Sequence, residues 1–351
     1  MRSAADLVRF FKMHGKAHSP LLILTHDHPD PDAIASAMAL AYLARTVAGV
    51  RCRMAYSGIL GRMENKTMVR ALKVPIYPLR VQTDFKRFKH VALVDTQPPF
   101  GNNAFPEGAH ADLVIDHHHT TSAPQARQLW IAPGVGATST LLGKAVLRLN
   151  RPVPVPLATA LIYGILSETQ DLGRETSAWD IQVYQALLPF CDLQKLSLIR
   201  NPQRPGSFYK TLNRSLDRAF VVNDLVGVHL GFVHTPDLVS QTADFLLTYE
   251  GMRWAFCTGR FQGKLHVSAR ALRPKRHVGK LLKEILPAGP GNAGQTQAGG
   301  HRTMAGGALV LNPPLKESVW RRAEKEIAHG LFKRLIRRRK LVLRYPFRTE
   351  R

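Results

Sequence analysis

The sequence has few cysteines and no long apolar run. Its three cysteines, Cys52, Cys191 and Cys257, lie far apart among 351 residues and show neither metal-binding nor disulfide spacing. This pattern excludes a disulfide-stapled secreted fold and predicts a cytoplasmic protein with reduced thiols. No apolar run reaches the ~20 residues of a membrane-spanning helix, and the segment before Leu21 is too polar for a signal peptide, so no membrane association is expected.

Acidic residues are also scarce, since 25 Asp and Glu face 49 Lys and Arg, for a net charge of +24. Residues 1–190 carry a net charge of +6 and residues 191–351 a net charge of +18. Basic surface on this scale favours a polyanionic partner such as nucleic acid. The basic residues near the C-terminus have two interpretations, a nucleic-acid contact or a solvated helix face.

The apolar fraction of 45% and the charged fraction of 21% are typical of a folded protein, and the length allows two domains. In residues 1–190 short apolar runs alternate with helical patterns. This predicts an α/β domain with a parallel-dominated sheet and helices on both faces. Residues 191–218 are interpreted as a linker, residues 219–315 as a smaller mixed α/β domain, and residues 316–351 as a basic helical tail.

Acidic and imidazole side chains follow several of the apolar runs of residues 1–190. They form four clusters: His26, Asp30 and Asp32; Asp95; Asp116, His117 and His118; and Glu168 with Asp171. Polar residues at strand ends of an α/β sheet are where such folds keep their sites. The alternative interpretation of the first cluster is a polar turn in which one Asp caps a helix. Capping needs only a single such residue, and this turn has several.

Mixed carboxylate and imidazole ligands suit Mn²⁺ or a similar ion. The donors outnumber the needs of one ion, so the sequence predicts two ions, a pair that binds a phosphate and activates a water molecule. Asp95 stands alone on its strand and is the candidate to bridge them.

Four segments resemble the motifs of the DHH (Asp-His-His) phosphoesterases: HDHPDPDA, LVDT, IDHHHT and GILSET. Residues 299–307 resemble the GGHxxAAG motif of the C-terminal domain associated with that family. Within the family the chain is most similar to the nanoRNase-like subgroup. Members of that subgroup degrade very short RNA oligonucleotides, and some remove the 3′-phosphate from phosphoadenosine phosphate.

The resemblance implies a ligand set for each ion. His26 and Asp30 would bind the first ion, Asp32 and His117 the second, and Asp95 both. Glu168 stands where the family has Asp, so either Glu168 or the nearby Asp171 would complete the second site. The implied ions are Mn²⁺, with Mg²⁺ and Co²⁺ as alternatives.

The resemblance also implies catalytic and substrate-binding residues. His118 would face the scissile phosphate, and Asp116 would orient a neighbouring imidazole. The residues implied to contact substrate in the C-terminal domain are Ser268, Arg270, Gly299, Gly300 and His301.

The resemblance therefore implies a phosphoesterase that hydrolyses short oligoribonucleotides and, as a further substrate, 3′-phosphoadenosine 5′-phosphate. Alternatives are a cyclic dinucleotide phosphodiesterase, a single-strand exonuclease, and a catalytically weakened nucleic-acid-binding protein. The choice between RNA and DNA and between a monomer and a homodimer is left open.

Overall fold

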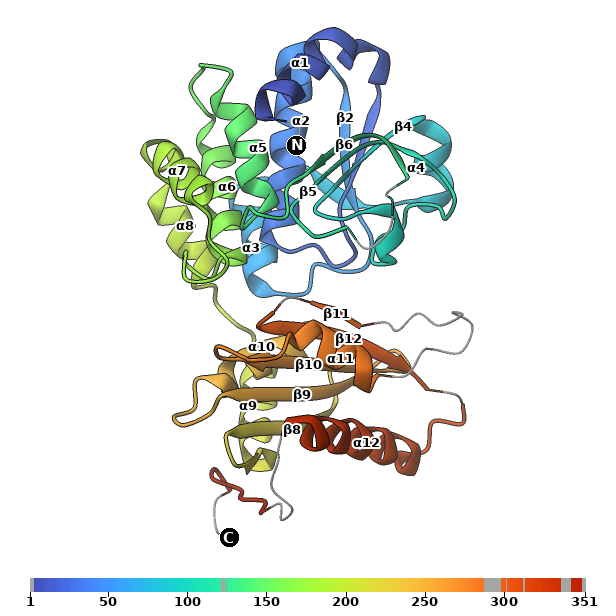
Figure 1. Cartoon of the computed structure of the whole chain (residues 1–351), viewed down its shortest axis with the longest axis vertical. Helices are drawn as coiled ribbons and strands as arrows, with labels where there is room; N and C mark the ends of the chain where they lie inside the picture. The colour runs from blue at the N-terminus through green and yellow to red at the C-terminus, as the bar shows by residue number, and fades with distance from the viewer. Residues whose placement is uncertain are drawn as a thin grey trace. The chain divides into compact units, whose positions relative to one another are not determined.

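The computed structural model describes residues 3–120, 123, 125–286, 298–300, 302–311, 313–335 and 342–348. The chain divides into two compact units, Met1–Gln203 and Arg204–Arg351, and each unit has its own sheet (Figure 1). The division falls inside residues 191–218, the predicted linker, most of which is helical. Within the described residues, no helix combines the length and the apolar character needed to cross a bilayer.

The sheet of the N-terminal unit has six strands in the order β3-β2-β1-β4-β5-β6, and every neighbouring pair is parallel. Its strands are β1 (Leu21–Leu24), β2 (Cys52–Tyr56), β3 (Ile76–Pro78), β4 (His90–Val94), β5 (Ala111–Asp116) and β6 (Ala126–Ile131). The central strands are buried on both faces, as expected for an all-parallel sheet.

Helices connect these strands and cover the sheet. They are α1 (Ala4–His14), α2 (Pro31–Ala48), α3 (Met63–Ala71), α4 (Val81–Arg87), α5 (Thr138–Leu147), α6 (Val155–Glu168), α7 (Ala178–Leu187) and α8 (Leu193–Arg200), with short 3₁₀ helices η1 (Gly15–His18), η2 (Pro98–Phe100) and η3 (Leu188–Phe190). One face of the sheet packs on a thick layer that contains α1, α2, α5 and α6 (Figure 1). The other face packs on a thinner apolar layer that includes Phe85 of α4 and Phe105.

Helix α2 is the centre of the thick layer. Asp30 caps its N-terminus, Pro31 follows at the first helical position, and Gly49 ends it in the left-handed conformation. Helix α6 packs against both α2 and α5. A Cβ at Gly164 of α6 would come within 3.2 Å of the Ala35 Cβ, so glycine is what allows this close approach.

The C-terminal unit has a mixed sheet in the order β11-β12-β10-β9-β8-β7, in which only the β8–β9 pair is parallel among the described strands. Its strands are β7 (Phe220–Val222), β8 (Leu225–Phe232), β9 (Trp254–Phe261), β10 (Lys264–Ala271), β11 (Ala298–Gly300) and β12 (Met304–Val310), and its helices are α9 (Gly206–Arg218), α10 (Asp237–Leu247), α11 (Val278–Ile285) and α12 (Glu317–Leu335). The predicted fold class, a parallel-dominated α/β domain with a smaller mixed α/β domain, is confirmed.

Helix α12 occupies most of the described part of the predicted basic tail, residues 316–351. It buries Trp320, Ile327 and Leu331 in the same apolar cluster as β10 and α11. The helix is therefore part of the core of this unit, and its basic residues lie on the remaining face. The described residues after it, 342–348, are not helical, and Arg344 forms a β-bridge with Val221.

Candidate metal centre

Most of the predicted donor residues come together at the carboxyl edge of the parallel sheet. β1, β4 and β5 are neighbours, and Leu24 near the end of β1 lies opposite Leu93 near the end of β4. The strands therefore end at similar levels. His26, Asp95 and Asp116, which lie at or just beyond these ends, meet at one edge.

The first donor group consists of His26, Asp30 and Asp95, each offering one ligand atom within 4.8 Å of the others. His26 Nε2 lies 3.7 Å from Asp30 Oδ1 and 3.6 Å from Asp95 Oδ2. His26 Nδ1 forms a 2.8 Å hydrogen bond with the Asp27 carbonyl oxygen, so Nε2 is the nitrogen turned toward the carboxylates. Asp30 Oδ1 also accepts from the Ala33 N–H at 3.0 Å, so the carboxylate caps α2 as well.

Asp95 also belongs to a second donor group, with His117 and His118. Its Oδ1 lies 3.6 Å from His117 Nε2 and 3.8 Å from His118 Nδ1, whereas its Oδ2 faces His26. Thr138 donates its hydroxyl to the same Oδ1 at 2.8 Å. Asp95 has φ 59°, a left-handed conformation that is uncommon for residues other than glycine. One carboxylate therefore presents an oxygen to each group.

A chain of hydrogen bonds holds His118. Its Nδ1 donates to Asp116 Oδ1 at 2.8 Å, and Asp116 Oδ2 accepts from Gln97 Nε2 at 2.8 Å. Burial opposes a charge on His118, but the hydrogen bond to Asp116 and its charge outweigh burial and raise the pKa of the imidazole. The neighbouring His117 differs, because burial and the charge of His118 lower its pKa to about 4. A neutral His117 suits metal ligation, and a charged His118 can donate a proton.

Asp32 adjoins the second group. Its side chain is buried, and its two oxygens accept backbone N–H groups from Thr138 at 2.8 Å and Ser139 at 2.7 Å, at the start of α5. Asp32 Oδ2 also lies 4.0 Å from His117 Nε2. Burial and the charge of Asp30 raise the pKa of Asp32 to about 6, against these hydrogen bonds. The Asp32 carboxylate therefore lies between the N-terminus of α5, which donates hydrogen bonds to it, and His117 of the second donor group.

Glu168 is the last residue of α6 and is paired with Arg174. Arg174 Nη2 lies 2.9 Å from Glu168 Oε1 and also donates to the Glu168 carbonyl oxygen. Burial and the charge of Asp30 raise the pKa of Glu168 to about 8, although Arg174 opposes the shift. Asp171, the alternative, has a side chain 60% exposed and pairs with Arg200 at 2.7 Å. Of the two acids, Glu168 is the less exposed, with a side chain 15% exposed, and it is the one close enough to Asp30 for their charges to interact.

The donor set fits divalent cations. Asp95 is almost fully buried, and burial together with the charges of Asp32 and Asp30 holds its pKa well above the ordinary value. Buried carboxylates in such numbers cost free energy unless they are protonated or a cation neutralises them. Carboxylate oxygens mixed with imidazole nitrogens are ligands that Mn²⁺ and related ions accept. The shared Asp95 and the excess negative charge together are what a pair of cations would require.

In the C-terminal unit, predicted substrate-binding residues lie on neighbouring strands. Ser268 is on β10 and Gly299 on β11, and Gly306 of the intervening β12 is paired with both. Gly300 ends β11 with φ 143°, where a Cβ would collide with the backbone of β12. His301 lies outside the described residues.

Arg270, two residues after Ser268 on β10, is buried and already has protein partners. It forms an ion pair with Asp244 and donates to Ser268 Oγ at 2.8 Å. A further donation reaches the Ala305 carbonyl oxygen at 3.3 Å. The Ser-x-Arg pair is therefore held rigidly on the strand rather than extended from the surface.

Gln97, Thr138 and Arg174 contact the candidate centre and were not predicted. Gln97 follows Asp95 by two residues, so its position beyond a strand end was a usable signal. Thr138 lies in the sequence GATST at the start of a helix, and Arg174 lies in a turn; neither carries a local pattern that points to this edge.

Comparison with known proteins gives independent information. Residues 20–165 match the model of the DHH family, N-terminal domain. An uncharacterised protein of Methanocaldococcus jannaschii is 33% identical over 302 residues, which are 86% of this chain and 60% of that protein. A Streptococcus equi subsp. zooepidemicus protein named "Probable manganese-dependent inorganic pyrophosphatase" is 28% identical over 169 residues, 45% of this chain and 51% of that protein. The chain therefore spans between half and two thirds of the length of these relatives.

Among solved structures, an exopolyphosphatase-related protein from Bacteroides fragilis is similar, with a TM-score of 0.70 and 14% identity. The match covers 95% of this chain and 98% of that one, so the two proteins share a fold through both units. The expected resemblance is confirmed by the family match, which spans three of the four quoted motifs and ends within the fourth, after Ile165. Residues 20–165 of this chain are therefore a DHH family, N-terminal domain.

Proposed function

We propose that the chain is a metal-dependent phosphoesterase whose centre lies at the carboxyl edge of the parallel sheet. One observation carries the proposal: Asp95 directs Oδ2 toward His26 and Oδ1 toward His117, and so belongs to two donor groups at once. A shared carboxylate is what a two-metal phosphoryl-transfer site needs. The names of the pyrophosphatase relatives, which specify manganese, agree with this class of chemistry.

We assign His26 and Asp30 to one ion, His117 and Asp32 to the other, and Asp95 to both. The chemistry that such ions supply when bound is neutralisation of phosphate charge and activation of water. Glu168 then supports the second site from its ion pair with Arg174. Mn²⁺ is the proposed ion, and Mg²⁺ and Co²⁺ are the alternatives to compare.

We assign His118 as the proton donor to the leaving oxygen. Its side chain is 30% exposed, so the ring reaches the surface of the centre while Nδ1 stays bound to Asp116. Asp116 fixes the orientation of the ring and favours its charged form. His118 thereby supplies a proton from a fixed position next to the carboxylates of the centre.

The proposed substrates are short oligoribonucleotides and 3′-phosphoadenosine 5′-phosphate. The motif resemblance and the net charge of +18 in residues 191–351 support an oligonucleotide. Ser268, Arg270, Gly299, Gly300 and His301 are the proposed substrate contacts of the C-terminal unit. The names of the relatives add inorganic pyrophosphate as a competitor, because that is the substrate they specify.

One set of assays tests the proposal. Turnover is measured with di- to decaribonucleotides, the matching deoxy series, phosphoadenosine phosphate, cyclic dinucleotides and pyrophosphate, each with Mn²⁺, Mg²⁺ or Co²⁺. We expect the shortest ribonucleotides with Mn²⁺ to be the best substrates. The double variant Asp116→Ala, His117→Ala is expected to abolish turnover, and full activity in that variant would reject the assigned centre. Preference for cyclic or long substrates would instead favour a cyclic dinucleotide phosphodiesterase or an exonuclease.

A second candidate function is nucleic-acid binding with weakened catalysis. It is favoured by the pairing of Glu168 with Arg174, because a carboxylate engaged by a guanidinium is less available to an ion. This candidate predicts tight, strongly salt-dependent RNA binding with no hydrolysis at any Mn²⁺ concentration. Filter binding across a salt series, run beside the turnover assay, separates the two.

Further parts of the proposal concern partners and location. We propose a cytoplasmic protein whose basic C-terminal unit contacts nucleic acid. On α12, exposed Arg321 and Arg322 pair with Glu317 and Glu326, so part of its charge is already neutralised. Light scattering coupled to gel filtration decides between a monomer and a homodimer.

A further inference from the structure

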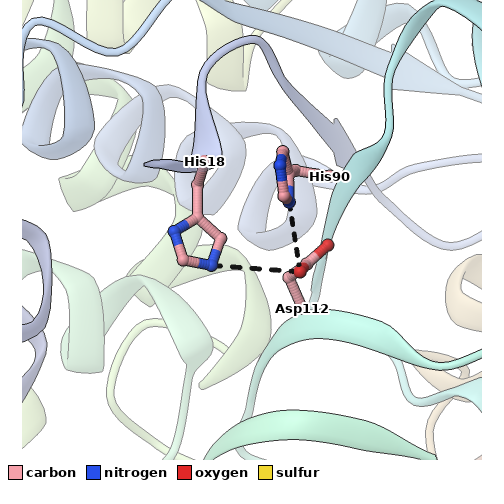
Figure 2. A group of neighbouring side chains, drawn as sticks. All are labelled: His18, His90 and Asp112. Atoms are coloured by element: carbon pink, nitrogen blue, oxygen red, sulfur yellow. Dashed lines mark hydrogen bonds and ion pairs between the residues drawn. The ribbon is translucent and has the colours of Figure 1, made fainter. Parts of the chain in front are cut away.

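A second group of metal-type donors lies at the amino edge of the same sheet. Figure 2 shows His18, His90 and Asp112 with their polar atoms directed toward one another. They come from three places in the sequence: His18 ends η1, His90 begins β4, and Asp112 is the second residue of β5. The candidate metal centre lies at the other end of these strands, so this group is separate from it.

The spacing of the three atoms suits one ion. His90 Nδ1 lies 3.2 Å from Asp112 Oδ1, His18 Nε2 lies 3.9 Å from the same oxygen, and all three atoms lie within 4.8 Å of one another. A tetrahedral ion with nitrogen and oxygen ligands at ~2.0–2.2 Å separates its donors by about 3.3–3.6 Å. Small side-chain movements would bring the three atoms to that spacing.

Backbone groups orient two of the three side chains for this task. His18 Nδ1 forms a 2.9 Å hydrogen bond with the His14 carbonyl oxygen, which makes Nδ1 the donor and leaves the Nε2 lone pair directed at Asp112. The Val91 N–H donates to Asp112 Oδ2 at 2.9 Å, so Oδ1 is the oxygen turned toward the imidazoles. Hydrogen bonds that fix the tautomer of a ligating imidazole and the orientation of a ligating carboxylate are typical of protein metal sites.

The surroundings combine an apolar wall with an open side. The ring of Phe10 packs on His18 with 5.1 Å between ring centroids, and Asp112 is buried. The His90 side chain is 27% exposed, so solvent reaches the group from its side. Arg127 is the rival cation: its Nη1 lies 3.4 Å from Asp112 Oδ1, but its side chain is 70% exposed and free to turn into solvent.

We propose that His18 Nε2, His90 Nδ1 and Asp112 Oδ1 bind one divalent transition-metal ion, with water in the remaining position. Two imidazoles and one carboxylate suit Zn²⁺, Co²⁺ or Ni²⁺ better than Ca²⁺ or Mg²⁺, which prefer all-oxygen sites. The ion ties η1, and through it α1, to β4 and β5. This site does not depend on the phosphoesterase activity proposed above.

Zn²⁺ content and crystallography test the site directly. The full-length chain is dialysed against Zn²⁺, and bound metal is counted by mass spectrometry for the wild type and for His18→Ala, His90→Ala. We expect the double variant to hold one ion fewer per chain. The matched control is His14→Ala, which removes a nearby exposed imidazole but keeps the backbone carbonyl that His18 uses; it is expected to hold as many ions as the wild type. Arg127→Ala is expected to bind Zn²⁺ at least as tightly as the wild type.

An anomalous difference map from wild-type crystals grown with Zn²⁺ needs no variant. We expect a peak between the three side chains, distinct from any peak at Asp95. An equal Zn²⁺ count in the wild type and the double variant, or no anomalous peak at His18 and His90 with Zn²⁺ in excess, would overturn the proposal. Loss of phosphoester hydrolysis would not bear on either measurement, so failure of the site and failure of the proposed function remain distinguishable.

Discussion

The two edges of the parallel sheet carry the same kinds of side chain in different proportions. At the amino edge, two imidazoles, a backbone N–H and a guanidinium surround the buried carboxylate of Asp112. The carboxyl edge crowds several buried carboxylates together, and burial with their mutual charge holds the pKa of Asp95 well above its ordinary value. Excess negative charge thus distinguishes the carboxyl edge, which requires cations, from the amino edge, where Asp112 is the one carboxylate in a proposed site that two imidazole ligands complete.

The strongest test of this comparison is Asp95→Asn. The substitution keeps the size of the side chain but removes the charge that both donor groups share. Residues that only orient metal ligands cost roughly 10–100-fold in activity when changed, so loss of the shared ligand is expected to exceed about 100-fold. Turnover under saturating Mn²⁺ measures this, with circular dichroism to verify the fold. A variant that kept a tenth of wild-type turnover would remove Asp95 from the centre.

A smaller loss is expected from Asp116→Asn. Asn can still accept the hydrogen bond from His118 Nδ1, but it no longer stabilises the charged imidazole that Asp116 favours. We expect turnover to fall by about 10–100-fold while metal content stays unchanged. Measuring turnover and metal content together separates a role in proton donation from a role in metal binding. If Asp116→Asn lost metal as well as turnover, Asp116 would be a determinant of the ion sites instead.

Two arginine–acid pairs near the end of α6 provide a matched comparison. Arg174 is buried and holds Glu168, whereas Arg200 is exposed and holds Asp171. The lysine side chain ends one bond short of the position of Arg174 Nη2, so it would not keep both contacts that this nitrogen makes with Glu168. We expect Arg174→Lys to lower turnover about 10-fold, at the lower end of the range for groups that support a metal site. Arg200→Lys should leave kcat and KM unaltered, and equal effects of both changes would place Glu168 outside the centre.

The crowding of carboxylates at the carboxyl edge also predicts that the stability of the metal-free protein depends on pH. The pKa of Glu168 is raised from 4.5 to about 8 in the folded chain, mainly by burial and by the charge of Asp30. The folded state therefore holds a proton that the unfolded state has lost, and this stabilising contribution is complete below pH 4.5 and disappears as the pH rises through about 8. In EDTA, the free energy of unfolding of the wild type relative to Glu168→Gln should fall over that range.

Saturating Mn²⁺ provides the control for this experiment. A bound cation favours the ionised carboxylate, so the difference between wild type and Glu168→Gln should lose most of its pH dependence when the metal is present. Urea denaturation at fixed ionic strength measures both series. A difference that is flat with pH in EDTA would mean that Glu168 is ionised by Arg174 alone.

Much of the fold and part of the site follow from local sequence. The apolar runs that end at Leu24, Val94 and Ile115 are buried strands, and polar residues after them reach one edge because the strands are parallel and adjacent. Strand β12 was not predicted, since the sequence MAGGALV has too few β-branched residues to signal a strand and is held by pairing with β10. Helix α9 lies inside the predicted linker, because few large apolar residues mark it.

The contacts that tie the site together were beyond the reach of sequence patterns. Thr138 meets Asp95 across 43 positions, and Ser139 meets Asp32 across 107, because α5 packs beside α2. Such contacts depend on how the helices pack, which periodicity does not encode. The amino-edge group was missed for the same reason, since His18, His90 and Asp112 share no motif and meet only through the register of β4 and β5.

The smallest expected effect sharpens the comparison between the edges. His90 begins β4 and Asp95 follows its end, so five residues at about 3.3 Å each put roughly 16 Å between them. An imidazole at that distance contacts no group of the carboxyl edge, so His90→Gln should keep turnover within about 2-fold of wild type, less than 0.5 kcal/mol in activation free energy. A loss above 10-fold, with the thermal midpoint unchanged, would mean that the two edges are coupled through β4. The wild-type rate in His90→Gln, combined with its altered Zn²⁺ content, would assign separate roles to the two edges.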